Sequence, residues 1–324
     1  MAFDFNALLT NEFASEVRKG LPYCQILNAP NMPQVQLDKF NPPHGIFISK
    51  ENADGAGLIT DGLMPHEQSF RDGEEVVQGF IFDRLRFVVL HISPLVVQSQ
   101  NQIVGLYFAP GGGVSDIGKL VSEQPKLYHS RSWWLIAPLT DTNELLSCSP
   151  IKLTMRGAVG ATFSQERKAV LQEMEIEFFK KANAPRQQLT NKARICFVMD
   201  WRFGYYKAAS DKAPHEYVSA RKGIADELKT ISSYGIGKNT RNVTIIPEPL
   251  ENLIIAPSSS EGQMLASWYD EYQESFFNRV KALTNPVAVE VTEEEIHSSD
   301  IEVEIAEFAA AHTGSASSPL SQFF

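Results

Sequence analysis

Aromatic and basic residues are interleaved in two short segments near the middle of the sequence. Residues 201–207 read Trp-Arg-Phe-Gly-Tyr-Tyr-Lys, and residues 131–134 read Arg-Ser-Trp-Trp. Flat rings are stacking surfaces for unpaired bases, each contributing about 1–3 kcal/mol, while cations neutralise the phosphates of a strand. The pattern therefore predicts a surface that binds single-stranded nucleic acid, either DNA or RNA. The predicted contact residues are Arg131, Trp133, Trp201, Arg202, Phe203, Tyr205, Tyr206, Lys207, Lys212, Arg221, Lys222, Lys238 and Arg241.

A second pattern, in residues 113–119, matches the GxxxxGK form of the loop that cradles phosphates in nucleoside triphosphatases. That loop has Ser or Thr at the next position to hold magnesium, and a helix follows it. This chain has Leu120 there, and Pro125 interrupts a helix soon afterwards. We therefore expect a plain glycine-rich connection. A nucleotide-dependent enzyme that uses Lys119 and Asp200 stays open as a second alternative.

Other catalytic and metal-binding patterns are missing from the sequence. It contains no GxSxG, HExxH or CxxC pattern, and its three cysteines lie far apart at positions 24, 148 and 196. Scattered cysteines of this kind are typical of reduced, buried thiols. The sequence predicts no catalytic residue, no metal site and no cofactor.

Charge is distributed unevenly along the chain. The formal net charge is −10, yet residues 287–324 alone hold eight acidic residues and no Lys or Arg. Residues 118–250 hold 20 Lys and Arg against 13 Asp and Glu. A basic middle and an acidic end fit a protein that binds a polyanion and keeps a negative arm elsewhere.

The elements that would position these residues are mostly short strands. We expect strands at 24–28, 45–49, 75–82, 85–92, 95–99, 103–108, 132–137, 151–156, 193–201 and 242–246. Close spacing of strands by turns predicts an antiparallel sheet or barrel. A first helix is expected to begin at a capping box at Thr162 and to be stopped by Pro185. Two more are expected over 216–231 and over 262–284, and in the last of them Met264 and Trp268 begin an apolar stripe. The predicted fold class is α+β: a substantial antiparallel sheet, open or barrel-like, with two or three packed helices and an acidic C-terminal tail.

Two parts are expected along the chain. Residues 1–286 form a globular body, with an internal boundary near 110–118 as one option, and residues 287–324 form the acidic tail. No apolar run reaches the ~18 residues of a membrane span, and the first residues lack the basic start of a secretory signal. We expect a cytoplasmic protein that does not contact membranes.

The tail ends in a Ser- and Ala-rich stretch followed by Pro-Leu-Ser-Gln-Phe-Phe. This arrangement resembles the tails of bacterial and phage single-stranded-DNA-binding proteins, in which an acidic arm competes with DNA and its tip docks partner proteins. The resemblance implies that Phe323 and Phe324 bind a protein partner. The tail differs from that pattern because 15 uncharged residues separate its last acid from Phe323. An edge strand or short helix around 302–305, packed on the body, stays open as the alternative.

The body has a resemblance of its own. Residues 21–28 (Leu-Pro-Tyr-Cys-Gln-Ile-Leu-Asn), 45–48 (Gly-Ile-Phe-Ile) and 151–157 (Ile-Lys-Leu-Thr-Met-Arg-Gly) are similar to a family of conserved cyanobacterial and plasmid or phage proteins of unknown function. That resemblance implies no activity. The leading hypothesis is a single-stranded nucleic-acid-binding accessory protein with a partner-docking tail. The alternative is a structural or assembly protein, such as a phage or filament subunit, that forms homo-oligomers.

Overall fold

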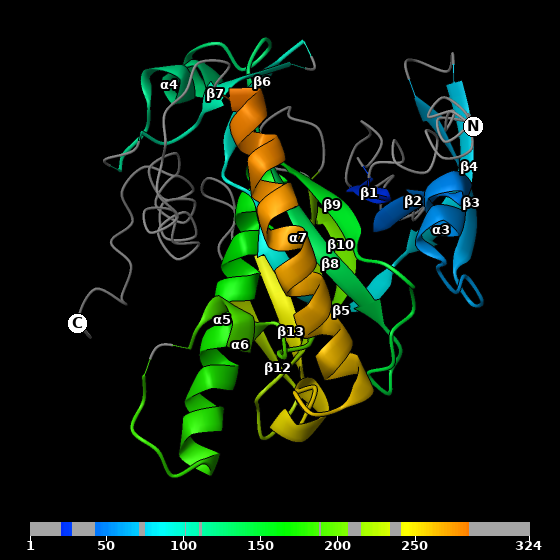
Figure 1. The fold of residues 1–324 in the computed structure, drawn as a ribbon, viewed down its shortest axis with the longest axis vertical. Coiled ribbons are helices and arrows are strands. Elements are labelled where there is room, and N and C mark those ends of the chain that lie inside the picture. Colours follow the sequence, from blue (N-terminus) through cyan, green and yellow to red (C-terminus); the bar gives the residue numbers. More distant parts are fainter. Residues whose placement is uncertain are drawn as a thin grey trace, which may run out of the picture.

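A computed structural model describes eight segments of the chain, and all that follows concerns these segments (Figure 1). They are residues 21–27, 43–70, 75–100, 102–109, 112–187, 189–206, 215–233 and 241–284. The acidic tail and its two terminal phenylalanines lie outside the described residues. In the described segments, no helix is both long enough and apolar enough to cross a membrane.

Thirteen strands form one curled, half-barrel sheet (Figure 1). Eleven of them follow the order β12-β13-β11-β10-β5-β8-β9-β1-β2-β4-β3, and β6 joins β7 to β8 beside this path. Most neighbours are antiparallel, but β1 with β9 and β11 with β13 are parallel. The strands are β1 Tyr23–Ile26, β2 Ile46–Ser49, β3 Met64–Phe70, β4 Glu75–Phe82, β5 Arg84–Ile92, β6 Val96–Ser99, β7 Gln102–Leu106, β8 His129–Leu139, β9 Ile151–Arg156, β10 Met199–Tyr206, β11 His215–Gly223, β12 Lys229–Ser233 and β13 Arg241–Pro247.

Two long helices lie against the sheet, and shorter ones sit in its connections (Figure 1). Helix α5 packs on β8, β9 and β11, whereas α7 contacts β5 and β7. We call the sheet face toward α5 the inner face and the face toward α7 the outer face. The helices are α3 Lys50–Ala56, α4 Asp116–Glu123, α5 Gly157–Lys181, α6 Asn191–Arg194, α7 Ser260–Thr284 and the 3-10 helix η3 Leu250–Leu253.

An aromatic cluster joins α5 to the inner face. The Phe163 ring lies parallel to Phe203 and edge-on to Trp201, with centroid distances of 5.6 and 5.5 Å. Trp201 in turn meets Phe87 and Trp134 edge to face. All five side chains are almost fully buried. Edge-to-face and offset pairs add to the free energy gained by burying apolar area, so this cluster anchors the helix in the curl.

The outer face has a smaller core under α7. Leu265 and Trp268 of α7 are buried against Val88, Leu135 and Ala137 of the sheet. Met264, which the sequence pattern placed in the buried stripe, is 46% exposed, so that part of the prediction was wrong. The helical periodicity and the burial of Trp268 are as predicted, but Leu265 takes the buried position that was assigned to Met264.

The predicted fold class, α+β with a large barrel-like sheet, is confirmed. The helix predicted over 216–231 is wrong, because these residues form β11 and β12. In β11 buried and more exposed side chains largely alternate, and backbone pairing with β10 and β13 outweighs the local helical pattern.

Two predicted element starts are also wrong. Helix α5 begins at Gly157, so Thr162 lies inside it and its hydroxyl donates to the Val159 carbonyl instead of capping. The strand predicted over 193–201 begins only at Met199, after α6.

We expect Phe163→Ala to lower the free energy of unfolding by about 3–5 kcal/mol, because it leaves a cavity between two buried rings. Ile176→Ala is the matched control on the same helix. Ile176 is 46% exposed, so its loss should change stability by less than about 0.5 kcal/mol. Urea unfolding measures both, and equal effects would contradict the placement of α5.

Candidate nucleic-acid interface

Two arginines face each other across neighbouring strands on the outer face. Arg131 of β8 is directly opposite Arg156 of β9 in the ladder. Side chains two residues apart on a strand share a face, so Arg131 lies on the same side as Trp133 and Leu135. Leu135 is buried in the core under α7, and Trp133 packs against its margin. Both arginines therefore belong to the outer face, beyond the area that this core occupies.

Within the described segments, no acid compensates this pair of like charges. Like charges directly opposite in a sheet are destabilising. Neither arginine makes an ion pair with any residue that the structure describes. Burial and the neighbouring Arg156 charge lower the pKa of Arg131 to about 10, and burial lowers the pKa of Arg156. Arg131 with a pKa near 10 still carries its charge at neutral pH, so the repulsion persists.

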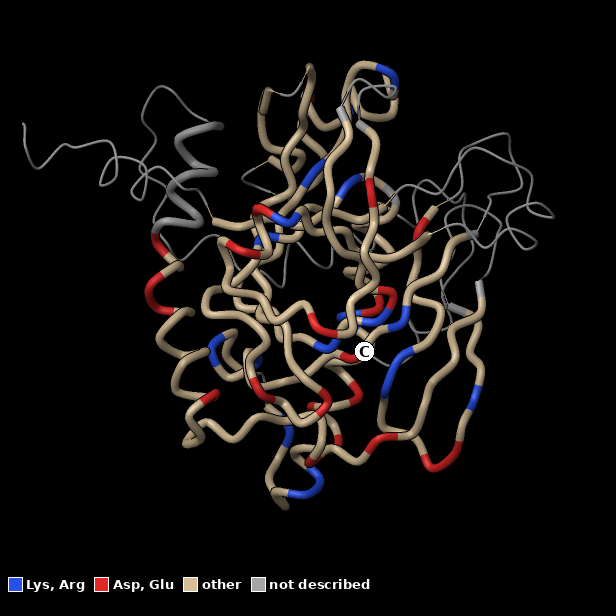
Figure 2. Tube along the Cα trace, turned by 90° about the vertical axis from the view of Figure 1, so that its right-hand side faces the viewer, with Lys and Arg blue, Asp and Glu red and all other residues tan. Residues whose placement is uncertain are grey.

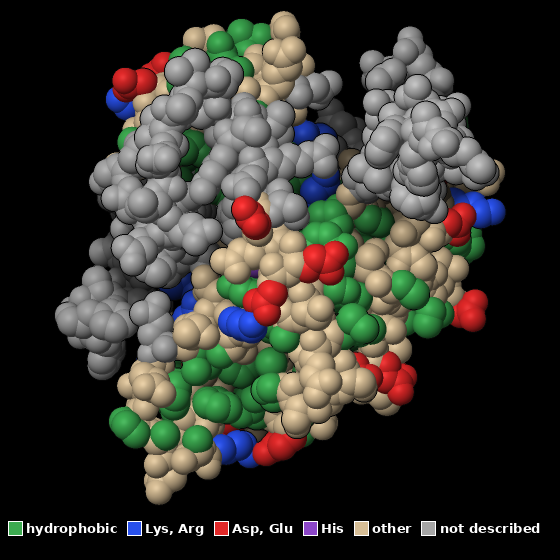
Figure 3. All heavy atoms as spheres, viewed as in Figure 1, with side chains coloured by type: hydrophobic (Ala, Val, Ile, Leu, Met, Phe, Trp, Pro, Cys, Tyr) green, Lys and Arg blue, Asp and Glu red, His purple; other side chains and the backbone are tan. Residues whose placement is uncertain are grey.

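Further cationic and aromatic groups continue along the same face. Tyr23 of β1 is paired with Lys152 of β9, and the Lys152 ammonium lies 5.9 Å from the centre of the Tyr23 ring. Tyr23 is 50% exposed. The sequences of β1, β8 and β9 contain no Asp or Glu. We call this set the basic strip: Tyr23, Arg131, Trp133, Lys152, Thr154 and Arg156. In Figure 3, basic side chains are seen in both halves of the molecule, several of them beside acidic ones.

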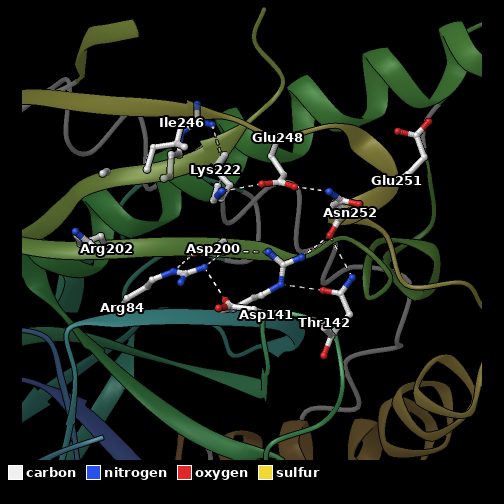
Figure 4. A pocket seen from close by; sticks show the side chains of 14 residues that line it. Arg84, Asp141, Thr142, Asp200, Arg202, Lys222, Ile246, Glu248, Glu251 and Asn252 are labelled. Carbon is white, nitrogen blue, oxygen red and sulfur yellow. Dashed lines mark hydrogen bonds and ion pairs between the residues drawn. The ribbon is translucent and has the colours of Figure 1, made fainter. Parts of the chain in front are cut away.

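A polar cavity of about 620 Å³ opens on another part of the outer face (Figure 4). Strands β5, β10, β11 and β13 form its floor, and the loop 141–143 and residues 248–252 form its walls. Arg84 donates to Asp200 from Nε and Nη2, at 2.8 and 2.6 Å, and its Nη2 also reaches Asp141. Arg86 donates to Asp200 at 2.9 Å and to the Asn252 carbonyl.

Asp200 is the charge centre of this network. Burial alone would raise the pKa of its carboxyl, but the hydrogen bonds and charges of Arg84 and Arg86 outweigh burial and lower it. At the opposite wall, Lys222 donates to Glu248 at 2.7 Å and similarly lowers the pKa of Glu248 against the effect of burial. Asp200 and Glu248 are therefore each compensated by a cation of the cavity, whereas Arg131 and Arg156 have no acidic partner among the described residues.

Three predicted contact residues lie in the core, which corrects the expectation that they form a surface. Trp201 and Phe203 belong to the aromatic cluster on the inner face, and neither exposes more than 2% of its surface. Arg221 is 1% exposed and binds Glu173 of α5 through two hydrogen bonds of 2.9 and 2.7 Å. Strand alternation explains the result, because Trp201 and Phe203 point toward α5 while Arg202 points away.

The remaining predicted residues are spread over several places. Arg131 and Trp133 are in the basic strip, whereas Arg202 and Lys222 line the cavity. The half-buried Tyr205 ring meets His44 edge to face, with centroids 5.6 Å apart. Tyr206 and Arg241 belong to β10 and β13, but their side chains lie outside the described atoms. Lys207, Lys212, Lys238, Phe323 and Phe324 lie outside the described residues.

The expected gathering of positive charge on one surface is only partly seen. Figure 2 shows basic and acidic positions interspersed along the described trace. Many cations of the middle segment pair with acids, such as Lys181 with Glu251 and Lys192 with Asp270. The basic strip differs from these places because no acid accompanies its arginines within the described segments.

The glycine-rich segment 113–119 forms the N-terminal cap and first turn of α4. Ser115 caps α4 by accepting from the Gly118 amide at 2.9 Å, and Lys119 pairs with Asp116. A Cβ on Gly118 would lie 2.2 Å from the Tyr107 carbonyl oxygen, so this glycine serves close packing. In the described part of the chain, no hydrogen bond or ion pair joins Lys119 to Asp200. Likewise, no three His, Cys, Asp or Glu side chains there form a group that could hold a metal ion.

Comparison with known proteins places most of the chain in one family. A family model described as a domain of unknown function, DUF5895, matches residues 18–254. The chain belongs to the DUF5895 family. The match contains every strand of the sheet, the basic strip and the cavity, and it ends before α7. No curated protein and no solved structure matches the chain. The resemblance of the tail to single-stranded-DNA-binding proteins therefore stays a prediction.

We expect Asp200→Asn to destabilise this DUF5895 protein by about 3 kcal/mol at pH 7, because it leaves Arg86 buried beside a neutral partner. The folded pKa of Asp200 lies below its unfolded value of about 3.9. Its contribution is therefore fully present above that unfolded pKa and is lost as the pH falls through the folded pKa.

Urea unfolding at pH 7 and near pH 3 should show the difference between wild type and Asp200→Asn shrinking in acid. Asp141→Asn is the control, because Asp141 also binds Arg84 but its side chain is 75% exposed. Its loss should cost less than about 1 kcal/mol. A pH-independent effect of Asp200→Asn would contradict the assignment.

Proposed function

We propose that this protein binds single-stranded nucleic acid through the basic strip. The cross-strand pair of Arg131 and Arg156 carries the proposal. Two like charges held side by side, without a described acid between them, raise the free energy of the empty protein. A phosphate placed between them would relieve the repulsion and accept charge-assisted hydrogen bonds from both guanidinium groups.

The rings of the strip support a single strand as the ligand. Trp133 and Tyr23 lie on the same face as the arginines, and Tyr23 presents half of its surface to solvent. Unpaired bases can stack on such rings, whereas bases inside a duplex already stack on each other. Stacking is tolerant of sequence, so we expect little base preference.

Docking of a protein partner through Phe323 and Phe324 is a separate proposal that rests on the sequence of the tail. Its physical basis is that two adjacent aromatic side chains on an acidic arm gain free energy when a partner surface buries them. It does not depend on how the basic strip is used.

The charge-removing double variant Arg131→Gln/Arg156→Gln should bind a labelled oligothymidine at least about tenfold more weakly in low salt, because two phosphate contacts are lost. The slope of log affinity against log salt should flatten by about 1.4, because each contact to a single strand contributes about 0.7. Fluorescence anisotropy across a salt series measures both quantities.

The matched control is Lys119→Gln/Lys180→Gln, which removes two exposed cations from α4 and α5. It should leave affinity and slope close to wild type. Urea unfolding adds a second readout: because the arginines repel each other, Arg131→Gln/Arg156→Gln should be at least as stable as wild type. Equal losses of affinity in the two double variants, or no loss in either, would refute the interface. Large ordered homo-assemblies without nucleic acid would favour an assembly protein instead.

A further inference from the structure

A second cross-strand pair of arginines lies in the polar cavity. Arg84 of β5 is directly opposite Arg202 of β10. Arg84 is compensated by Asp200 and Asp141, but the Arg202 side chain makes no hydrogen bond or ion pair with any residue in the described segments. One positive charge at this end of the cavity is therefore left without a partner within the described structure.

The two ends of the cavity differ in chemistry. Figure 4 shows Arg84 and Arg202 at one end and Glu248, Glu251 and Asn252 at the other, with Lys222 between them. The second end offers carboxylate and amide oxygens, which accept hydrogen bonds from hydroxyl groups. A ligand that spans the cavity needs an anionic group at one end and hydroxyl groups at the other.

The lining also indicates which ligands fit poorly. Among the described residues that line the cavity, Ala220 and Ile246 have apolar side chains and none has an aromatic ring. A nucleobase would find no stacking partner there. The carboxylates of Glu248 and Glu251 repel the further phosphates that a strand spanning the cavity would bring to that wall, so the cavity is unsuited to the ligand proposed for the basic strip.

We propose that this cavity binds a small sugar phosphate, with the phosphate held between Arg202 and Arg84 and the sugar hydroxyls bound at the opposite wall. A phosphate carries close to two negative charges and three acceptor oxygens, which suits two guanidinium groups approaching from neighbouring strands. The cavity volume of about 620 Å³ lies within the usual range for small-molecule sites. This site is independent of the proposed nucleic-acid interface.

Isothermal titration calorimetry of the full chain with glucose 6-phosphate, glucose and inorganic phosphate tests the proposal. Glucose 6-phosphate should bind more tightly than either of the other two, because only it engages both ends of the cavity. Arg202→Gln should weaken its binding at least about tenfold through loss of a charge-assisted hydrogen bond, and Arg202→Lys should retain part of the affinity. Arg202 is exposed and lacks a described side-chain partner, so its variants should keep the unfolding temperature of wild type.

Arg156→Gln is the matched control, because it removes an arginine from the basic strip and should leave glucose 6-phosphate binding unchanged. Arg202→Gln should conversely leave oligothymidine binding unchanged, so each of the two proposed sites can be refuted without the other. The proposal is overturned by any of three results: no binding of glucose 6-phosphate at millimolar concentration, binding indifferent to Arg202→Gln, or inorganic phosphate binding as tightly. Preference for adenosine monophosphate over glucose 6-phosphate would also overturn it, since it would require a base-binding surface.

Discussion

The packing of α5 into the curl of the sheet fixes the orientation of nearly every other side chain discussed above. Phe163 lies between Trp201 and Phe203, and Arg221 reaches from β11 to hold Glu173 of the helix. A buried ion pair of this kind adds little net stability, but removing one partner would leave a buried charge without compensation. The aromatic contacts supply the stabilisation, and the ion pair fixes where along the strands the helix sits.

Because the inner face is used in this way, alternation sends the intervening side chains to the outer face. There α7 covers the apolar centre, and two pairs of cross-strand arginines remain beyond it. Arg131 and Arg156 sit among strands without acids, which suits a chain of phosphates. Arg84 and Arg202 lie at one end of a cavity whose other end carries carboxylates, which leaves room for one small anion but not for a chain of phosphates. The same arrangement of strands thus provides two surfaces of different electrostatic character.

Local sequence patterns predicted much of this fold but little of how its side chains meet. Apolar and β-branched runs separated by turn residues identified β4, β5 and β9, and the apolar periodicity identified α7, because both are short-range signals. The same alternation in residues 151–156 would have placed Lys152 and Arg156 on one face. Alternation along residues 201–203 likewise separates Arg202 from Trp201 and Phe203, whereas the interleaving of rings and cations predicts one surface for all three. The bond between Arg84 and Asp200 joins residues 116 positions apart, which no local pattern can reveal.

The most direct test of this account is ultraviolet cross-linking of the full chain to oligothymidine, with the adducts located by mass spectrometry. The orientation imposed by α5 leaves Tyr23 and Trp133 on the outer face and seals Trp201 inside. We predict adducts on peptides that contain Tyr23 or Trp133, and none on Trp201 or Phe203. Adducts on Trp201 or Phe203, or adducts that avoid β1 and β8 altogether, would contradict the assignment of the outer face as the binding surface.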